Sequence, residues 1–207
     1  MSLTRRVVAI AFALVFLTAS SLAQKNEVSG LIGRIFIPTQ TIQGATFFNP
    51  NVHFGNGVSI EANYSRHLMG DGFWALRFEV PFIINFKTGL NTGANLIPKD
   101  YSAFFITPSA RLHAFADTAV SPWVSFGGGY GRFNVSDELL YGGPNPGDSN
   151  NTGILQFGAG LDVRIKGPWS ARLAARDFWT SVPNLNVQTN RDRQHNFWVG
   201  GGIAYRF

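Results

Sequence analysis

Charged residues occur at alternate positions in segments that are otherwise apolar or small. Glu61 stands between Ile60 and Ala62, and Arg172 follows the same pattern. Because alternate side chains of a strand share a face, this spacing would gather the charged groups on one side of a sheet. Gathered there, carboxylates and guanidinium groups could form ion pairs or line a path for ions. The charged face is expected to contain Arg34, Glu61, Arg77, Glu79, Arg111, Asp162, Arg164, Arg172, Arg176 and Arg206.

A few other side chains have types suited to catalysis or metal binding. Ser109 and His113 share a face of one expected strand, but four residues along a strand separate them by about 13 Å. His67 with Asp71, and His113 with Asp117, lack a third ligand nearby in the sequence. We therefore expect no enzyme activity, no metal site and no cofactor.

The alternation itself predicts the strands that would position the charged face. It recurs in eight stretches: 27–37, 55–67, 73–85, 101–115, 121–133, 152–166, 169–180 and 195–207. Three of the breaks between them are tight, at 68–72, 116–120 and 167–168, and four are long and rich in Asn, Gly, Pro and Thr. Folding about the tight breaks would place Asp162 opposite Arg172 and bring Glu61 near Arg77 and Glu79.

Residues 1–23 have the layout of a cleavable secretory signal, and 24–207 would form one domain. A basic start with Arg5 and Arg6 precedes an apolar run at 7–17 and a small-residue tail, which places cleavage between Ala23 and Gln24. The alternative is an uncleaved anchor, but the run is shorter than the roughly 20 residues that span a bilayer. The chain has no cysteine, which excludes disulfides and a cysteine-linked lipid anchor.

The last ten residues have an apolar face that ends in aromatic side chains. This face consists of Val199, Gly201, Ile203, Tyr205 and Phe207. A terminal Phe with an aromatic two places before it resembles the C-terminal assembly signal of bacterial outer-membrane barrels. The resemblance implies that this strand contacts the barrel-assembly machinery.

Over 24–207 the chain resembles the small eight-stranded outer-membrane barrels grouped as OmpA-like or OmpX-like β-barrel domains. The expected fold is therefore all-β: an eight-stranded antiparallel up-and-down transmembrane β-barrel, preceded by a cleavable signal peptide. With both termini in the periplasm, the tight breaks are periplasmic and the four long ones are extracellular loops. The resemblance implies a Gram-negative outer membrane, with its lipid and lipopolysaccharide as partners. No histidine begins the His-x-Ser pair that lipid A deacylase barrels carry.

Glycines, prolines and aromatic residues refine this expectation. Three apolar-Gly-small-Gly-apolar stretches, at 126–130, 157–161 and 199–203, place pairs of glycines on the inward face of a narrow barrel. Pro81 and Pro108 fall inside expected strands, so each predicts a bulge or a local strand end. Aromatic residues are expected at the two membrane interfaces: Trp74, Trp123, Trp169, Tyr205 and Phe207 on the periplasmic side, and Tyr101, Phe133, Trp179 and Phe197 on the outer side.

Three functions stay open at this point. A barrel of eight strands is filled by its own side chains, which favours a structural or surface-interaction protein with an extracellular ligand, present as a monomer. The alternatives are a narrow pore or small-solute transporter, biased towards anions by its excess of arginine, and a soluble periplasmic carrier of an apolar ligand. The net charge of +5 falls to +3 without Arg5 and Arg6, so nucleic acid is not an expected partner.

Overall fold

The computed structural model describes residues 25–45, 49–93 and 95–207, so the expected signal segment and its cleavage site at Ala23 and Gln24 lie outside the described residues. The strands in the described ranges are β1 (Asn26–Phe36), β2 (Gln40–Thr41), β3 (Asn51–Phe54), β4 (Val58–Met69), β5 (Trp74–Asn91), β6 (Asp100–Ile106), β7 (Ser109–Ala114), β8 (Val120–Val135), β9 (Asn150–Lys166), β10 (Trp169–Ser181) and β11 (Arg193–Arg206). In this part of the chain no helix is long and apolar enough to cross a membrane.

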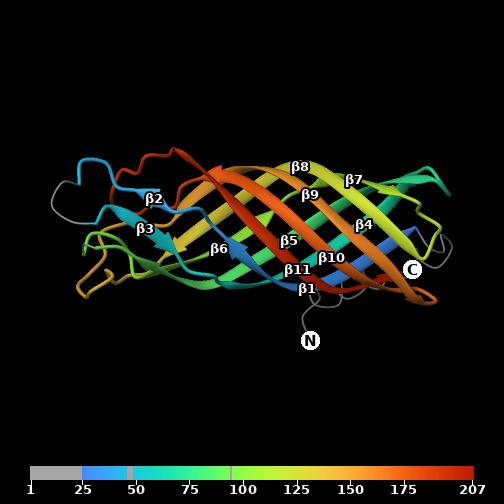
Figure 1. Ribbon diagram of the computed structural model, residues 1–207, viewed down its shortest axis with the longest axis horizontal. Helices are drawn as coiled ribbons and strands as arrows, with labels where there is room; N and C mark the ends of the chain where they lie inside the picture. Colours follow the sequence, from blue (N-terminus) through green and yellow to red (C-terminus); the bar gives the residue numbers. More distant parts are fainter. Residues whose placement is uncertain (1–24, 46–48, 94) are drawn as a thin grey trace, which may run out of the picture.

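The strands form a long, narrow, closed antiparallel barrel (Figure 1). Each wall strand pairs with its neighbours in chain order, with β6 and β7 acting as two segments of one wall strand between β5 and β8. Strand β1 pairs with β11 from Glu27 opposite Arg206 to Phe36 opposite Phe197, which closes the sheet. The wall therefore has eight strands, as the sequence predicted.

The tight turns and the long loops lie at opposite ends of the barrel. The end that holds the three short turns, together with Asn26 and Phe207, is called the turn end; the other is the loop end (Figure 1). Strands β5 and β8 continue past their expected ends to Asn91 and Val135, and β2 and β3 form a hairpin inside the first long break. The wall therefore extends further at the loop end than the alternation alone indicated.

The two prolines lie on neighbouring wall strands, with Pro81 across from the residue before Pro108, and the two predictions have different outcomes. The prediction for Pro108 is confirmed, because the gap between β6 and β7 falls at residues 107–108. The prediction for Pro81 is wrong, since β5 runs through it and its carbonyl accepts a bond from the Thr107 amide at 3.2 Å. Proline lacks only the amide donor, and its carbonyl still serves the neighbouring strand. The pairing register on either side of the gap is the same.

The two faces of the wall differ sharply in chemistry. Large apolar side chains point outwards and stay exposed, including Ile32 at 69 %, Leu173 at 62 % and Val124 at 56 %. Ionic and polar side chains of the same strands are buried inside, such as Glu61 and Arg172. An apolar band this large around a closed sheet is the surface that lipid covers.

Gly160 and Gly200 of the repeated pattern lie on the inward face as predicted, and together with Gly33 they make room for two buried tryptophans, which the sequence did not predict. A Cβ atom on Gly33 or Gly200 would collide with the ring of Trp198, and one on Gly160 would collide with the ring of Trp123. Both indoles are fully enclosed, at 0 % and 2 % exposure. The glycines therefore let large side chains cross a narrow lumen.

Candidate functional site

Six wall strands and the β7 segment direct charged side chains into the half of the lumen nearer the turn end. Together these side chains form the luminal ion cluster: Glu27 of β1, Glu61 of β4, Arg77 and Glu79 of β5, Arg111 of β7, Asp162 of β9, Arg172 and Arg176 of β10, and Arg206 of β11. Arg206 is 16 % exposed at the edge, and the other eight residues are buried. The alternation of these strands is what places the charges inside.

Arg176 joins two carboxylates from neighbouring strands. Its Nε and Nη2 donate to the two oxygens of Glu61, each at 3.0 Å, and its Nη1 donates to Glu79 Oε1 at 2.8 Å. The predicted closeness of Glu61 and Glu79 is therefore real, but Arg176 bridges them. Glu61 faces Ile83 across the β4–β5 pair, so the expected contact with Arg77 is wrong.

Arg172 and Arg111 meet at Glu27. Arg172 donates to both oxygens of Asp162, at 2.7 and 2.6 Å, which confirms the predicted pair. Its Nη2 also lies 2.6 Å from Glu27 Oε1, the same oxygen that Arg111 Nη2 contacts at 2.6 Å. Arg206 Nε donates to the other oxygen of Glu27 at 3.0 Å. Glu27 is thus the carboxylate that connects the most arginines in the cluster.

An indole ring lies among the arginines. The guanidinium carbons of Arg111, Arg172 and Arg176 are 5.3 to 5.9 Å from the ring centre of Trp123, and its Nε1 donates to Asp162 at 3.2 Å. The expectation that Trp123 belongs to an interface belt is therefore wrong. The sequence did indicate an inward position, because Trp123 is an even number of residues from Gly127 and Gly129 and so shares their face of the strand.

Three other expectations about the charged face need correction, two of them on β1. Arg34 is exposed on the outer face of β1, whereas Glu27, which was not among the expected residues, lies inside at 1 % exposure. Apolar residues occupy both faces of β1, with Leu31 and Ile35 inside, so alternation there does not tell the faces apart. Arg164 is exposed at the rim of the turn end, where its Nη1 lies 3.5 Å from the Asp117 carbonyl.

The buried charges of the luminal ion cluster balance. Glu27, Glu61, Glu79 and Asp162 are matched in number by the buried arginines at positions 77, 111, 172 and 176. The excess of arginine expected inside the lumen is therefore wrong, because Arg34 lies outside and Arg164 and Arg206 lie at the rim. A lumen in which each carboxylate contacts a guanidinium group resists entry of a free ion of either sign.

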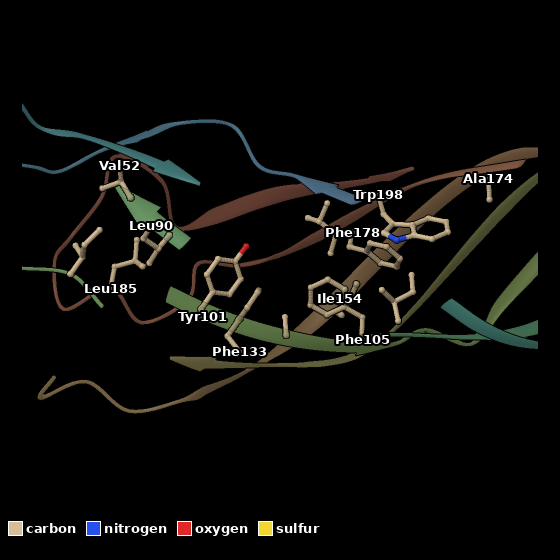
Figure 2. Packing of buried hydrophobic residues seen from close by; sticks show 14 of the residues in the cluster. Val52, Leu90, Tyr101, Phe105, Phe133, Ile154, Ala174, Phe178, Leu185 and Trp198 are labelled. Carbon is tan, nitrogen blue, oxygen red and sulfur yellow. The ribbon is translucent and has the colours of Figure 1, made fainter. Parts of the chain in front are cut away.

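Apolar side chains fill the lumen beyond the cluster, towards the loop end (Figure 2). Trp198, Phe178, Phe105 and Ile154 follow the charged layer, and Tyr101 and Phe133 continue the column. Rings of Phe105 and Phe178 lie 5.2 Å apart, and those of Phe105 and Phe133 lie 5.8 Å apart. This apolar plug was not expected. It also places Tyr101 and Phe133 inside the barrel, which corrects their assignment to the outer interface.

The loops continue the packing at the loop end. Val52 of β3, Leu90 near the end of β5 and Leu185 from the connection between β10 and β11 are buried against the same column (Figure 2). Polar bonds join these segments to others at the same end: Gln40 of β2 donates to Gln194 of β11 at 2.7 Å, and Asn186 donates to Asn145, in the connection between β8 and β9, at 2.6 Å. The loop end is therefore capped by its own loops.

Solved structures share this arrangement of a closed antiparallel wall. The neisserial surface protein A is 12 % identical, with a TM-score of 0.54 over 88 % of this chain and 97 % of that one. The outer-membrane protein OprG from Pseudomonas aeruginosa is also 12 % identical, with a TM-score of 0.53 over 89 % and 96 %. The chain has the fold of a small outer-membrane β-barrel. No protein-family model matches the sequence, and no curated protein matches it.

In this small outer-membrane β-barrel Ser109 and His113, which share a face but were not expected to be catalytic, have separate partners. Ser109 Oγ donates to Gln156 Oε1 at 2.5 Å, whereas His113 Nδ1 lies 3.1 Å from Ser121 Oγ. Within the described residues, no group of three His, Cys, Asp or Glu side chains could hold a metal ion.

The residues of the expected assembly signal lie on the outer face of the barrel. Val199 and Ile203 are 53 % and 52 % exposed, and the rings of Tyr205 and Phe207 stack 6.2 Å apart. Trp169 of β10 lies 4.8 Å from Tyr205, which extends the aromatic patch at the turn end. Aromatic side chains at this position suit the interface between lipid and water.

Proposed function

We propose that this protein is an integral outer-membrane barrel with a structural or surface-interaction role, presented through its four loops. The observation that carries the proposal is the filled lumen inside an apolar wall. The luminal ion cluster occupies the half nearer the turn end, and the apolar plug occupies the half nearer the loop end. The turn end would face the periplasm and the loop end would face the outside, as in other barrels with short turns on one side.

The two layers oppose passage of solutes for different reasons. An ion that enters the luminal ion cluster must separate contacts such as the one at 2.8 Å between Arg176 and Glu79. A hydrated solute that passes this layer meets Trp198, Phe178 and Phe105, which offer it few polar partners. Both layers favour a closed barrel over the alternative of a pore.

The loops are built to present a fixed surface. Tyr141 is 63 % exposed, yet its hydroxyl donates to the Thr92 carbonyl at 2.7 Å and its amide donates to Asn95 at 2.8 Å. Nearby, Lys99 Nζ lies 3.4 Å from Glu138. Loops held to one another lose less conformational entropy when a partner binds. These contacts support a binding role for the segment between β8 and β9.

Recording from planar lipid bilayers tests the closed lumen. We expect no steady conductance from the wild-type protein, with a general porin in the same bilayer as the positive control. Steady conductance that is abolished by Arg172→Gln or Glu61→Gln would show that the cluster lines an ion path, and would favour the pore.

Envelope fractionation tests the location and the orientation. We expect the protein in the outer-membrane fraction and a short epitope inserted near Gly147 to be accessible on intact cells. The same epitope inserted at Gly167, in the turn between β9 and β10, should be accessible only after the outer membrane is opened. Release of the protein by osmotic shock would favour a soluble ligand carrier instead.

A further inference from the structure

A cavity of about 470 Å³ opens at the turn end, next to the luminal ion cluster. Its walls come from the end of β4 and the turn that follows it, from β5, from the turn between β7 and β8, and from the ends of β9 and β11, with Lys25 beside them. The lining residues that carry a charge or an imidazole are Lys25, His67, Asp71, Arg77, Asp117, Arg164 and Arg206.

Arg77 lines this cavity, and among the described residues its Nη1 atom has no hydrogen-bond partner. Its side chain is only 8 % exposed, and its Nη1 atom is buried and unbonded. The nearest carboxylate oxygen, Glu27 Oε2, is 3.8 Å away. A buried guanidinium nitrogen that donates no bond is costly, because it has lost its water without replacing it.

Glu27 does not satisfy Arg77 because other donors already occupy it. Arg111 and Arg172 each contact its Oε1 at 2.6 Å, and Arg206 donates to its Oε2 at 3.0 Å. Among the described residues, Arg77 is therefore left with no carboxylate closer than 3.8 Å, while its side chain lines the cavity.

The remaining charges around the cavity favour an anion. Four positively charged side chains line the cavity, those of Lys25, Arg77, Arg164 and Arg206, and two negatively charged ones, those of Asp71 and Asp117. Asp71 lies 3.8 Å from His67, and its side chain is 95 % exposed, so water screens it well. The arginines therefore dominate the interior of the cavity.

We propose that this cavity binds a phosphate group, with Arg77 as its principal ligand and Arg164 and Lys25 at the rim. Guanidinium groups bind such oxyanions through paired hydrogen bonds, and the partly enclosed position strengthens each one. The phosphate could be free or esterified to a larger molecule, since both present the same oxygens. In the proposed orientation the cavity takes this ligand from the periplasm.

Isothermal titration of the envelope-purified protein in a neutral detergent tests the site, with inorganic phosphate as the probe at constant ionic strength. We expect saturable binding that Arg77→Gln weakens by about tenfold or more, since it removes charge-assisted bonds. Lys166→Gln removes one positive charge at the same end outside the cavity, and should leave the affinity unchanged. Arg164→Gln alters only an exposed side chain and should weaken binding even if Arg77→Gln does not fold.

Two further probes separate the possible sources of the phosphate. Glycerol 3-phosphate that binds more tightly than inorganic phosphate would indicate an esterified ligand, and the reverse would indicate free phosphate. The proposal is overturned if phosphate does not bind, if acetate binds as tightly, or if Lys166→Gln weakens binding as much as the cavity variants do.

Discussion

At the scale of single residues, the lumen depends on arginines that each serve more than one carboxylate. Arg176 contacts Glu61 and Glu79, and Arg172 contacts Glu27 and Asp162. Removing Arg176 leaves Glu61 without an arginine partner among the described residues, and leaves Glu79 with Arg111 alone, at 3.1 Å. The cost is therefore larger than that of breaking a single surface pair.

Arg176→Ala tests this dependence. We expect the free energy of unfolding to fall by about 3–5 kcal/mol, since breaking a buried pair strands the remaining charges. Urea unfolding in detergent micelles measures the change, with Arg164→Ala as the exposed control, for which we expect about 1 kcal/mol or less.

A triple variant shows whether the loss of stability in Arg176→Ala comes from unpaired carboxylates or from lost packing. Arg176→Met combined with Glu61→Gln and Glu79→Gln removes the carboxylates together with their partner, and should recover most of the loss. An equally unstable triple variant would indicate that shape, rather than charge, makes Arg176 important.

At the scale of elements, the strands were predictable and the contents of the lumen were only partly so. Period-two alternation placed all eight wall strands, because the outer face is apolar along most of their length. The inner and outer faces of β1 were predicted the wrong way round, because both faces carry apolar residues. The apolar plug was missed for a related reason: Phe105 and Phe178 are inward, where the pattern led us to expect polar side chains.

Gly200→Ala tests how closely the inward glycines fit the wall. A Cβ at this position would lie 2.8 Å from the Ile32 carbonyl and also collide with the Trp198 ring, so β11 or the ring must move. We expect a loss of about 1–3 kcal/mol in the same unfolding assay. Gly201→Ala is the matched control on the outer face, where the added carbon would meet only the Leu173 side chain and, at 3.7 Å, the Arg172 carbonyl. Equal stability of the two variants would contradict the proposed fit.

At the scale of the whole molecule, the barrel depends on the pairing of its first and last strands. Backbone bonds between Asn26 and Phe207, at 3.0 and 2.9 Å, complete the ladder at the turn end. The outward aromatic side chains of Tyr205 and Phe207 lie at this same end of the barrel. If the assembly machinery recognises them, their loss should affect assembly more than it affects the finished barrel.

Phe207→Ser tests that separation. We expect several-fold less protein in the outer-membrane fraction, whereas protein refolded into detergent should unfold at nearly the same urea concentration as the wild type. Lys166→Ser is the control at the same end of the barrel, and is preferable to a change at Arg206, which donates to Glu27. Equal envelope yields from the two variants would refute a role of Phe207 in assembly.

Asn26 and Phe207 are adjacent, so the pair between the first and last strands is built like every other strand pair of the wall. A short peptide joining these positions would make one more tight turn, and the backbone could then be opened at Gly167 without removing any strand pair. Such a circular permutant would keep every strand pair of the native wall, while β10 and β11 would become the first two strands of the polypeptide. A permutant as stable as the native chain would show that the stability of the barrel does not depend on the order of its strands along the polypeptide.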